Sequence, residues 1–503
     1  MTIAEAKEEI RNTVRAYLAT DDTGNLLIPR EKQRPVLLMG PPGIGKTAIM
    51  EQVAQELHVN LVSYTITHHT RQSAIGLPFI SKRKYDNKEY SVTEYTMSEI
   101  IASVYDKIAL SGVSEGILFL DEINCVSETL VPTMLQFLQY KTFGAHEVPQ
   151  GFVIVTAGNP PEYNNSVRDF DVVTLDRVRR MDVEASYDAW KPYALSNGMH
   201  GSVLAYLEIH KNHFYSMRTE ADGRHFVTAR GWEDLSRLIA ANEALSINVN
   251  ETLCVQFLQD ADIARSFALY YALWQKYKDL YDVEKILAGE MPSGETKKTL
   301  QRAPFDEKLS VLTLLQTALS GSFARFSVQL EAAKRLRDAL LLVTEDASPA
   351  EDAASEIAEA AHALKAAGKK QADANLISRR EAQIRQDVAD ALFSFAEALR
   401  LEESADEETT ENYLRARFAK REEERLAGAE KTDARLTNAF SFLEETFGEG
   451  QEMVLFLTAL IKNEDAVCFV NEYGNEAYFR YNRRLLLDEN RRELAREALS
   501  LMS

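Results

Sequence analysis

The stretch of this chain best equipped for chemistry is a glycine-rich segment between a short apolar run and an amphipathic one. Residues 40–47 read G-P-P-G-I-G-K-T and fit the pattern G-x-x-x-x-G-K-[S/T] at each fixed position. In this pattern, consecutive backbone N–H groups and a helix N-terminus surround phosphate oxygens, and Gly43 and Gly45 allow that close approach. Lys46 adds a positive charge over the β- and γ-phosphates, and the Thr47 hydroxyl can ligate Mg²⁺. The predicted phosphate-contacting residues are Gly40, Pro41, Pro42, Gly43, Ile44, Gly45, Lys46, Thr47 and Ala48.

Two acidic residues end another apolar run. Asp121 and Glu122 directly follow G-I-L-F-L at residues 116–120. Carboxylates at the end of a buried strand are costly unless charge chemistry requires them there. Downstream of a phosphate loop, Asp121 is expected to bind Mg²⁺ through water. Glu122 is expected to polarise a water for in-line displacement at phosphorus.

Two further polar residues are candidates for the same site. Asn159 follows the apolar run 152–157, from where it can reach a γ-phosphate and the water beside Glu122. An asparagine before a proline is also a common turn residue, which is the alternative. Arg230 falls in the first turn of an expected helix capped by Thr228. A cation is poorly placed there against the helix dipole, which indicates an anion partner or else an exposed arginine tolerated at small cost.

The elements that must position these residues alternate between strands and helices. Four segments are expected to be strands: 36–39, 61–66, 116–120 and 152–157. The run 36–39 is apolar without interruption, which is typical of a parallel strand buried on both faces. Helical patterns cover 1–18, 48–57, 97–110 and 128–139. Hairpins are expected within 76–95, which could equally be a long loop, and within 140–151 with a turn at Gly144. The predicted fold class is therefore α/β.

The second half of the chain has a different composition. From about residue 300 onward, glycine and proline are scarce, while alanine, leucine, glutamate and arginine dominate, as in long helices. Ser348 and Pro349 are expected to start a helix that continues to residue 400, with Gly368 as its only break. The charge-dense stretch 402–424 also favours a helix. No catalytic pattern follows residue 290.

Composition limits the classes of function. The 503 residues carry a net charge of −20, which opposes nonspecific binding to nucleic acid. The three cysteines lie far apart, without the spacing of a disulfide framework or zinc knuckle. No apolar stretch approaches the ~18–20 residues that would span a membrane, and the N-terminus does not read as a signal peptide. The expected location is cytoplasmic.

Four segments together resemble the AAA+ ATPases. They read G-P-P-G-I-G-K-T, L-F-L-D-E-I-N, T-A-G-N-P-P and T-A-R-G-W-E-D-L, and the first two correspond to the Walker A and Walker B motifs. Asn124 and the expected hairpins look most like the MoxR-type branch of the helix-insert clade, which is related to dynein-type modules. The resemblance covers roughly residues 1–290 and implies ATP and Mg²⁺ as ligands.

The resemblance also implies residue roles. Asn159 corresponds to sensor 1, Arg230 to sensor 2, and Arg177 to an arginine finger presented to a neighbouring subunit. Where MoxR proteins read like P-E-A-Q-L-D-R-F, this chain reads F-D-V-V-T-L-D-R-V-R-R. The choice among Arg177, Arg179 and Arg180 therefore stays open.

The implied architecture has three parts: an AAA+ nucleotide-binding domain (1–185), a small helical lid (186–290) and an all-α C-terminal domain for partner binding or assembly (291–503). The implied function is ATP hydrolysis by an oligomeric ring, a hexamer by analogy, that remodels a protein partner in a chaperone-like way. That partner could carry a von Willebrand factor A domain. The alternatives are a GTP-dependent motor of the restriction type and a nucleotide-gated scaffold with little turnover. Glu122 argues against the scaffold, since a binding-only switch needs no water-activating base.

Overall fold

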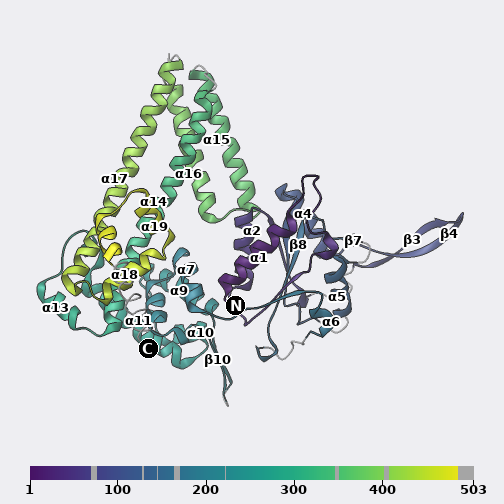
Figure 1. The fold of residues 1–503 in the computed structure, drawn as a ribbon, viewed down its shortest axis with the longest axis horizontal. Coiled ribbons are helices and arrows are strands. Elements are labelled where there is room, and N and C mark those ends of the chain that lie inside the picture. Colours follow the sequence, from purple (N-terminus) through teal and green to yellow (C-terminus); the bar gives the residue numbers. More distant parts are fainter. Residues whose placement is uncertain are drawn as a thin grey trace, which may run out of the picture. The chain divides into compact units, whose positions relative to one another are not determined.

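The computed structural model describes residues 1–68, 76–126, 130–143, 146–163, 170–220, 223–345, 350–401 and 407–484. The chain divides into two compact units (Figure 1). The first unit comprises residues 1–190, 228–230 and 366–382, and the second comprises the remaining described residues.

The first unit is built on a five-stranded parallel sheet with the strand order β2-β5-β8-β1-β9. Its strands are β1 (Val36–Met39), β2 (Asn60–Thr65), β5 (Gly116–Asp121), β8 (Phe152–Gly158) and β9 (Arg179–Asp182). Its main helices are α1 (Ile3–Leu18), α2 (Lys46–Leu57), α4 (Glu99–Ser111) and α5 (Val131–Tyr140). The predicted α/β class is confirmed, and the four predicted strands are found within one residue of their expected ends.

The strands lack polar alternation because helices cover both faces of the sheet. Along β1, Leu37 and Met39 belong to the core cluster that includes α4 and α5 side chains, whereas Val36 and Leu38 are buried outside that cluster. Successive side chains point to opposite faces of a strand, so both sets must be apolar. On the N-terminal side, α1 is preceded by Thr2, which forms a reciprocal capping box with Glu5.

Two hairpins accompany the sheet. The first, β3 (Pro78–Tyr85) with β4 (Lys88–Tyr95), confirms the hairpin interpretation of residues 76–95. Its turn residues Asp86 and Asn87 have φ of 46° and 62°, as a two-residue type I′ turn requires. The second pairs β6 (Thr142–Phe143) with β7 (His146–Glu147). Its expected turn at Gly144 lies outside the described residues.

The second unit is predominantly helical. Its elements are α8 (Gly201–Ile209), β10 (Ser216–Glu220), β11 (Gly223–Val227), α10 (Glu251–Leu258), α11 (Ala261–Tyr281), α12 (Val283–Leu287), α13 (Gly294–Arg302), α14 (Phe305–Glu345), α17 (Glu407–Phe447), α18 (Gln451–Ile461) and α19 (Glu464–Glu472). It also contains most of α9 (Ala229–Ala244), α15 (Ala350–Asp373) and α16 (Arg379–Arg400), whose residues 229–230, 366–373 and 379–382 belong to the first unit. The helix α7 (Tyr187–Ser196) joins the two units. The antiparallel pair β10–β11 lies inside the expected helical lid and was not predicted.

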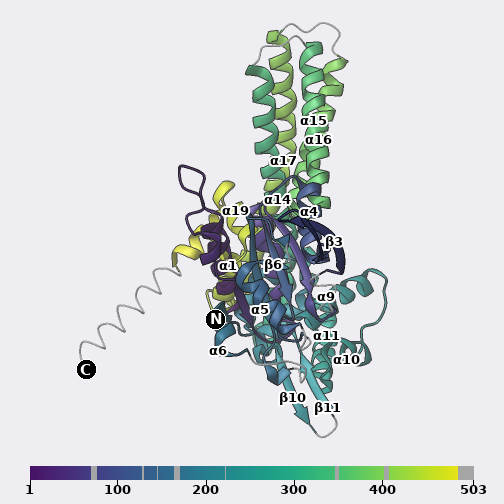
Figure 2. The same cartoon turned by 90° about the vertical axis from the view of Figure 1, so that its right-hand side faces the viewer.

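Four of these helices run side by side (Figure 2). The helices α14, α15, α16 and α17 share one apolar cluster that includes Leu336, Ile357, Leu392 and Leu414. The helix α14 also contacts the expected lid, because the Ser310 hydroxyl lies 2.7 Å from the Tyr270 hydroxyl of α11. The boundary at residue 290 stays a prediction.

The predicted break at Gly368 is wrong. Gly368 lies inside α15, and the chain turns instead at residues 374–378. A helical glycine costs only about 1 kcal/mol, which tertiary packing can offset. The actual break combines Asn375, with φ of 55°, and Ser378, whose hydroxyl accepts the Glu381 N–H at 3.1 Å. The helix predicted over 402–424 is confirmed from Glu407 onward, whereas Ser348 and Pro349 lie outside the described residues.

Among the described residues, no helix combines the length and the apolar character needed to cross a membrane.

Replacing Gly116 by alanine should destabilise the first unit. The new Cβ would lie 2.4 Å from a ring carbon of buried Phe152 and 2.9 Å from the backbone oxygen of Asn60. Overpacking of this kind costs about 1–3 kcal/mol of unfolding free energy. The control is Gly321→Ala in α14, where nothing lies within 4 Å of the new Cβ and helix propensity favours alanine by up to about 1 kcal/mol. Urea unfolding of the full chain measures both, and equal stability of the two variants would contradict the packing argument.

Candidate active site

The carboxyl ends of the parallel strands bring the predicted residues to one edge of the sheet. Met39 pairs with Gly158, and Thr65 pairs with Asp121. The segments that follow β1, β5 and β8 therefore start side by side. In open α/β sheets this edge is where ligands bind. The phosphate loop, Glu122 and Asn159 are accordingly brought together, as the sequence predicts.

The phosphate loop is shaped by two glycines in the left-handed region. Gly43 and Gly45 have φ of 75° and 98°, and a Cβ on Gly43 would lie 2.8 Å from the Thr228 side chain. The Arg230 N–H donates to the Gly43 carbonyl at 3.2 Å, so the start of α9 is tied to the loop. The helix α2 begins at Lys46, and its first-turn N–H groups have no intrahelical acceptors. This arrangement fits a bound phosphate.

The Lys46 ammonium connects the loop to the end of β8. Its Nζ donates to the carbonyl oxygens of Gly40 at 2.6 Å and Pro41 at 2.8 Å, and to Asn159 Oδ1 at 2.8 Å. The residue is only 8% exposed. The pKa of Lys46 is lowered to about 8, mainly because the ammonium is buried and also because of the Arg230 charge, whereas Asp121 and Glu122 oppose the shift. A phosphate would supply the counter-charge that this buried cation lacks.

Thr47 and Asp121 provide the oxygens expected of a magnesium site. The Thr47 hydroxyl donates to Asp121 Oδ2 at 3.2 Å, and Asp121 Oδ1 accepts the Glu122 N–H at 2.9 Å. A hydroxyl and a carboxylate oxygen are ligands that Mg²⁺ prefers, and the ion commonly combines them with water and phosphate oxygens. The two residues therefore fit the predicted ion.

Glu122 adopts a strained backbone conformation. Its φ is 56°, which is uncommon for a residue with a Cβ and concentrates at functional positions. The Thr67 hydroxyl donates to Glu122 Oε2 at 3.0 Å. Sequence reasoning missed Thr67. Thr67 follows the end of strand β2 by two residues. A hydroxyl so close to the carboxyl end of a predicted parallel strand is the sequence feature that would have indicated it.

Asn124 holds Asn159 in place. Its Nδ2 donates to the Asn159 carbonyl at 2.7 Å, and its Oδ1 accepts the Asn159 N–H at 3.3 Å. A Cβ on Gly158 would lie 2.6 Å from Asn124 Oδ1, so any larger residue at position 158 would force the Asn124 side chain to move. The sequence marks Asn124 only through the family resemblance, because its role depends on contact with Asn159, which lies 35 residues further along the chain.

The three candidate arginines differ in their partners. Arg179 forms an ion pair with Glu9 and donates to the Thr13 hydroxyl at 2.6 Å. Arg180 pairs with Asp182 at 2.8 Å. The Arg177 side chain has no ion pair among the residues that the structure describes. Arg177 is therefore the member of the three that these contacts leave available to another molecule.

Comparison with known proteins agrees with this geometry. Residues 35–178 match the family model described as AAA domain (dynein-related subfamily). This region is an AAA domain. The match contains the phosphate loop, Asp121, Glu122 and Asn159, and it ends just after Arg177. No curated protein matches the chain significantly.

Two solved structures are similar at low identity. PCH-2 from C. elegans is 15% identical with a TM-score of 0.24, over 41% of this chain and 47% of the other. This chain thus spans about half the length of that relative. A mutant of RuvB from Thermotoga maritima is 14% identical with a TM-score of 0.26, over 59% of this chain and 74% of the other.

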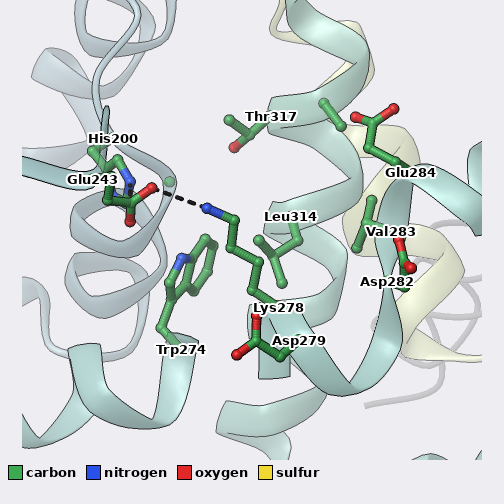
Figure 3. Close-up of a pocket in the computed structure, with 12 residues that line it drawn as sticks. His200, Glu243, Trp274, Lys278, Asp279, Asp282, Val283, Glu284, Leu314 and Thr317 are labelled. Atoms are coloured by element: carbon green, nitrogen blue, oxygen red, sulfur yellow. Dashed lines mark hydrogen bonds and ion pairs between the residues drawn. The ribbon is translucent and has the colours of Figure 1, made fainter. Parts of the chain in front are cut away.

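The second unit has a cavity of about 570 Å³, bordered by helices α8, α9, α11, α12 and α14 (Figure 3). Glu243 accepts hydrogen bonds there from Lys278 Nζ at 2.9 Å and Tyr271 Oη at 3.0 Å, and it lies 3.2 Å from His200 Nε2. The hydrogen bond from His200 is the main reason why the pKa of Glu243 is lowered. Because the Glu243 carboxylate already accepts several hydrogen bonds, this cluster ties together the helices that its side chains come from.

Nucleotide affinity of the AAA domain should fall as the pH rises above 8. The charged ammonium of Lys46 favours phosphate, and its pKa in the free protein is about 8. A bound phosphate raises that pKa, so the complex binds the proton more tightly. Affinity should be constant below pH 8 and then fall by up to about tenfold per pH unit. Titration with a fluorescent ATP analogue on both sides of pH 8 measures this. Lys46→Arg, which stays charged, should remove the dependence, and a flat wild-type profile would contradict the role of Lys46.

Proposed function

We propose that this chain is an ATP-hydrolysing AAA+ motor that acts on a protein partner as an oligomeric ring. The observation that carries the proposal is the meeting of five groups at one sheet edge. They are the cation of Lys46, the adjacent Thr47 and Asp121, the strained Glu122, and Asn159 bonded to Lys46. This set matches what in-line attack of water on a γ-phosphate requires.

Each residue has a distinct role in this proposal. Lys46 donates hydrogen bonds to phosphate oxygens, which replace the carbonyl oxygens of Gly40 and Pro41 as its acceptors. Thr47 and Asp121 hold Mg²⁺, which when bound neutralises charge on the β- and γ-phosphates. Glu122 accepts a proton from the attacking water, and Asn159 orients that water and contacts the γ-phosphate. Arg230 lies at the start of α9, where its N–H donates to the Gly43 carbonyl. In this proposal its guanidinium contacts the phosphates.

The proposed finger is Arg177. Phosphoryl transfer needs a cation over the charge that develops between the β- and γ-phosphates, and an arginine supplies it best. Arg179 and Arg180 are already paired within their own chain. Arg177 forms no ion pair among the described residues. In this proposal its partner is the nucleotide of a neighbouring subunit, as in a ring. The hexamer is taken from the family resemblance.

The partner is proposed to be a protein, and the function to be MoxR-like, chaperone-like remodelling. These finer assignments rest on the resemblance of the motifs, as does a partner with a von Willebrand factor A domain. Two alternatives remain distinguishable by experiment. Preferential binding of GTP in a nucleotide competition assay would favour a restriction-type motor, and stoichiometric ATP binding without turnover would favour a nucleotide-gated scaffold.

Glu122→Gln should keep nucleotide binding but lower ATP turnover by about 10²–10⁴, the usual contribution of a positioned base. The amide keeps the size of the side chain and can still contact Thr67, so folding should be unaffected. Lys46→Ala is the matched contrast and should lose nucleotide binding itself. A coupled phosphate-release assay and a binding titration separate the two effects. Normal turnover in Glu122→Gln, or unchanged affinity in Lys46→Ala, would refute the assigned role.

Mixing two inactive variants should restore activity if the finger acts between subunits. Arg177→Ala removes the finger and Lys46→Ala removes the phosphate contact, so each variant alone should lose about 10³-fold or more in turnover. A mixed ring can pair an intact phosphate loop with a neighbour's intact Arg177. ATPase activity is measured against the mixing ratio in rings shown to be mixed. Absence of recovery at every ratio would count against a finger in trans, and wild-type activity in Arg177→Ala would assign the role elsewhere.

A further inference from the structure

The cavity of the second unit has the size of a small-molecule site. Its volume of about 570 Å³ falls within the range of about 300–1,000 Å³ that ligand pockets usually have. All the residues that line it belong to the second unit. Part of the lining is apolar and comes from Val283 of α12 and from Leu314 and Ala318 of α14. The polar groups of the lining that lack partners then decide which ligand the cavity suits.

Three of the carboxylates that line the cavity are already paired within the protein. Glu284 accepts hydrogen bonds from Arg435 at 2.8 and 3.3 Å. Asp282 forms an ion pair with Lys285 at 2.7 Å. The Glu243 carboxylate accepts the several hydrogen bonds described above. These groups have little capacity left for a ligand, so their number does not make the cavity a cation site.

The indole N–H of Trp274 is an unused donor in the cavity wall. Trp274 is only 2% exposed, yet its N–H has no hydrogen-bond acceptor among the residues that the structure describes. The equally buried Trp232 donates to the His213 carbonyl at 3.0 Å, as a buried indole normally does. Protein atoms do not seal the Trp274 nitrogen in, so the space open to it is the cavity that Trp274 lines.

Two charged side chains of α11 also have unused hydrogen-bonding capacity in the cavity. Lys278 lies one helical turn after Trp274, so the two side chains share a face of the helix (Figure 3). Its ammonium has three N–H donors and makes one hydrogen bond with the described residues, to Glu243 at 2.9 Å. Asp279 is exposed and forms no hydrogen bond or ion pair with the described part of the chain. The cavity thus combines unused donors and one unused carboxylate with an apolar surface.

We propose that this cavity binds a free α-amino acid with a large apolar side chain. The carboxylate of the ligand accepts hydrogen bonds from the Trp274 N–H and the Lys278 ammonium. Its ammonium donates to Asp279, and its side chain packs on Val283 and Leu314. Both charged groups of an amino acid are attached to one carbon, so they can reach two consecutive residues of α11. This inference goes beyond the proposed ATPase function and does not depend on it.

Other simple ligands leave one of these groups unpaired. An anion satisfies Lys278 but places its charge beside Asp279, whereas an amine satisfies Asp279 but leaves the Trp274 N–H without an acceptor. A peptide carries its ammonium and its carboxylate on different residues, so it cannot pair both with neighbouring side chains. The amino acid zwitterion satisfies all three groups, because it carries both charges and has no net charge.

Isothermal titration calorimetry of the full chain without nucleotide tests the proposal with L-leucine and L-phenylalanine. At least one of them should bind with a Kd of about 1 mM or lower, as expected of a well-fitted ligand of this size. N-acetyl-L-phenylalanine lacks the ammonium and phenethylamine lacks the carboxylate. Each should bind about tenfold more weakly than L-phenylalanine, because a charge-assisted hydrogen bond is lost. Adding the amino acid at about ten times its Kd should also raise the Tm.

Three substitutions each remove one proposed contact. Asp279→Asn keeps the shape of the side chain without its charge, and Lys278→Met keeps most of the length without the ammonium. Trp274→Phe removes the N–H and keeps an aromatic ring. Each variant should weaken binding of the amino acid about tenfold. Asp279 and Lys278 are exposed, so their variants should fold and test the proposal even if Trp274→Phe does not.

The matched controls make the same changes elsewhere on α11. Lys276→Met and Asp262→Asn alter exposed residues that do not line the cavity. Each control should change Kd by less than about twofold, because the long-range effect of one exposed charge is screened by salt.

Three results would overturn the proposal. They are the absence of binding of either amino acid at about 5 mM, well above the expected Kd, equal or tighter binding of phenethylamine or N-acetyl-L-phenylalanine, and equal weakening by cavity and control variants. ATP turnover is not part of the readout. A failed binding test therefore leaves the ATPase proposal standing, and an inactive ATPase leaves the binding result interpretable.

Discussion

The rest of the candidate site depends on one buried cation. Lys46 is almost fully removed from water, and its ammonium is satisfied by two carbonyls of its own loop and by the amide of Asn159. Burying an ammonium is costly unless it is fully hydrogen-bonded. The loop after β1 and the end of β8 must therefore keep a fixed separation, and the Asn124 amide maintains it by binding the Asn159 backbone on both sides. The phosphate loop is one continuous segment of the sequence, yet its lysine is positioned by a residue that follows another strand, β8.

The parts of the fold that sequence could predict are those set by short-range physics. Uninterrupted apolar runs identify buried parallel strands, because helices cover both faces of the sheet and leave no solvent side. The Thr2 cap and the Asp86–Asn87 turn were similarly readable, since each depends on neighbouring residues only. The phosphate loop belongs to the same class. Its residue types are dictated by the ligand and not by the rest of the fold.

What sequence could not predict depends on contacts between distant residues. Thr67 reaches Glu122 only because β2 and β5 are neighbours in the sheet, and strand order is not written in local patterns. Gly368 looked like a helix break by propensity, yet packing carries the helix through it and the turn falls at Asn375. The β10–β11 pair was likewise missed, because short strands with mixed polarity carry a weak periodic signal.

The left-handed backbone at Glu122 puts stability and activity into conflict at a single position. A residue with a Cβ pays about 1–3 kcal/mol to hold such a φ, whereas glycine or asparagine adopts it at little cost. Any selection for thermal resistance alone, in the laboratory or in nature, would therefore favour replacing this glutamate. The variant with the highest melting temperature would then be one that had lost the proposed base. The strain at Glu122 is the stability cost that the proposed ATP turnover would carry.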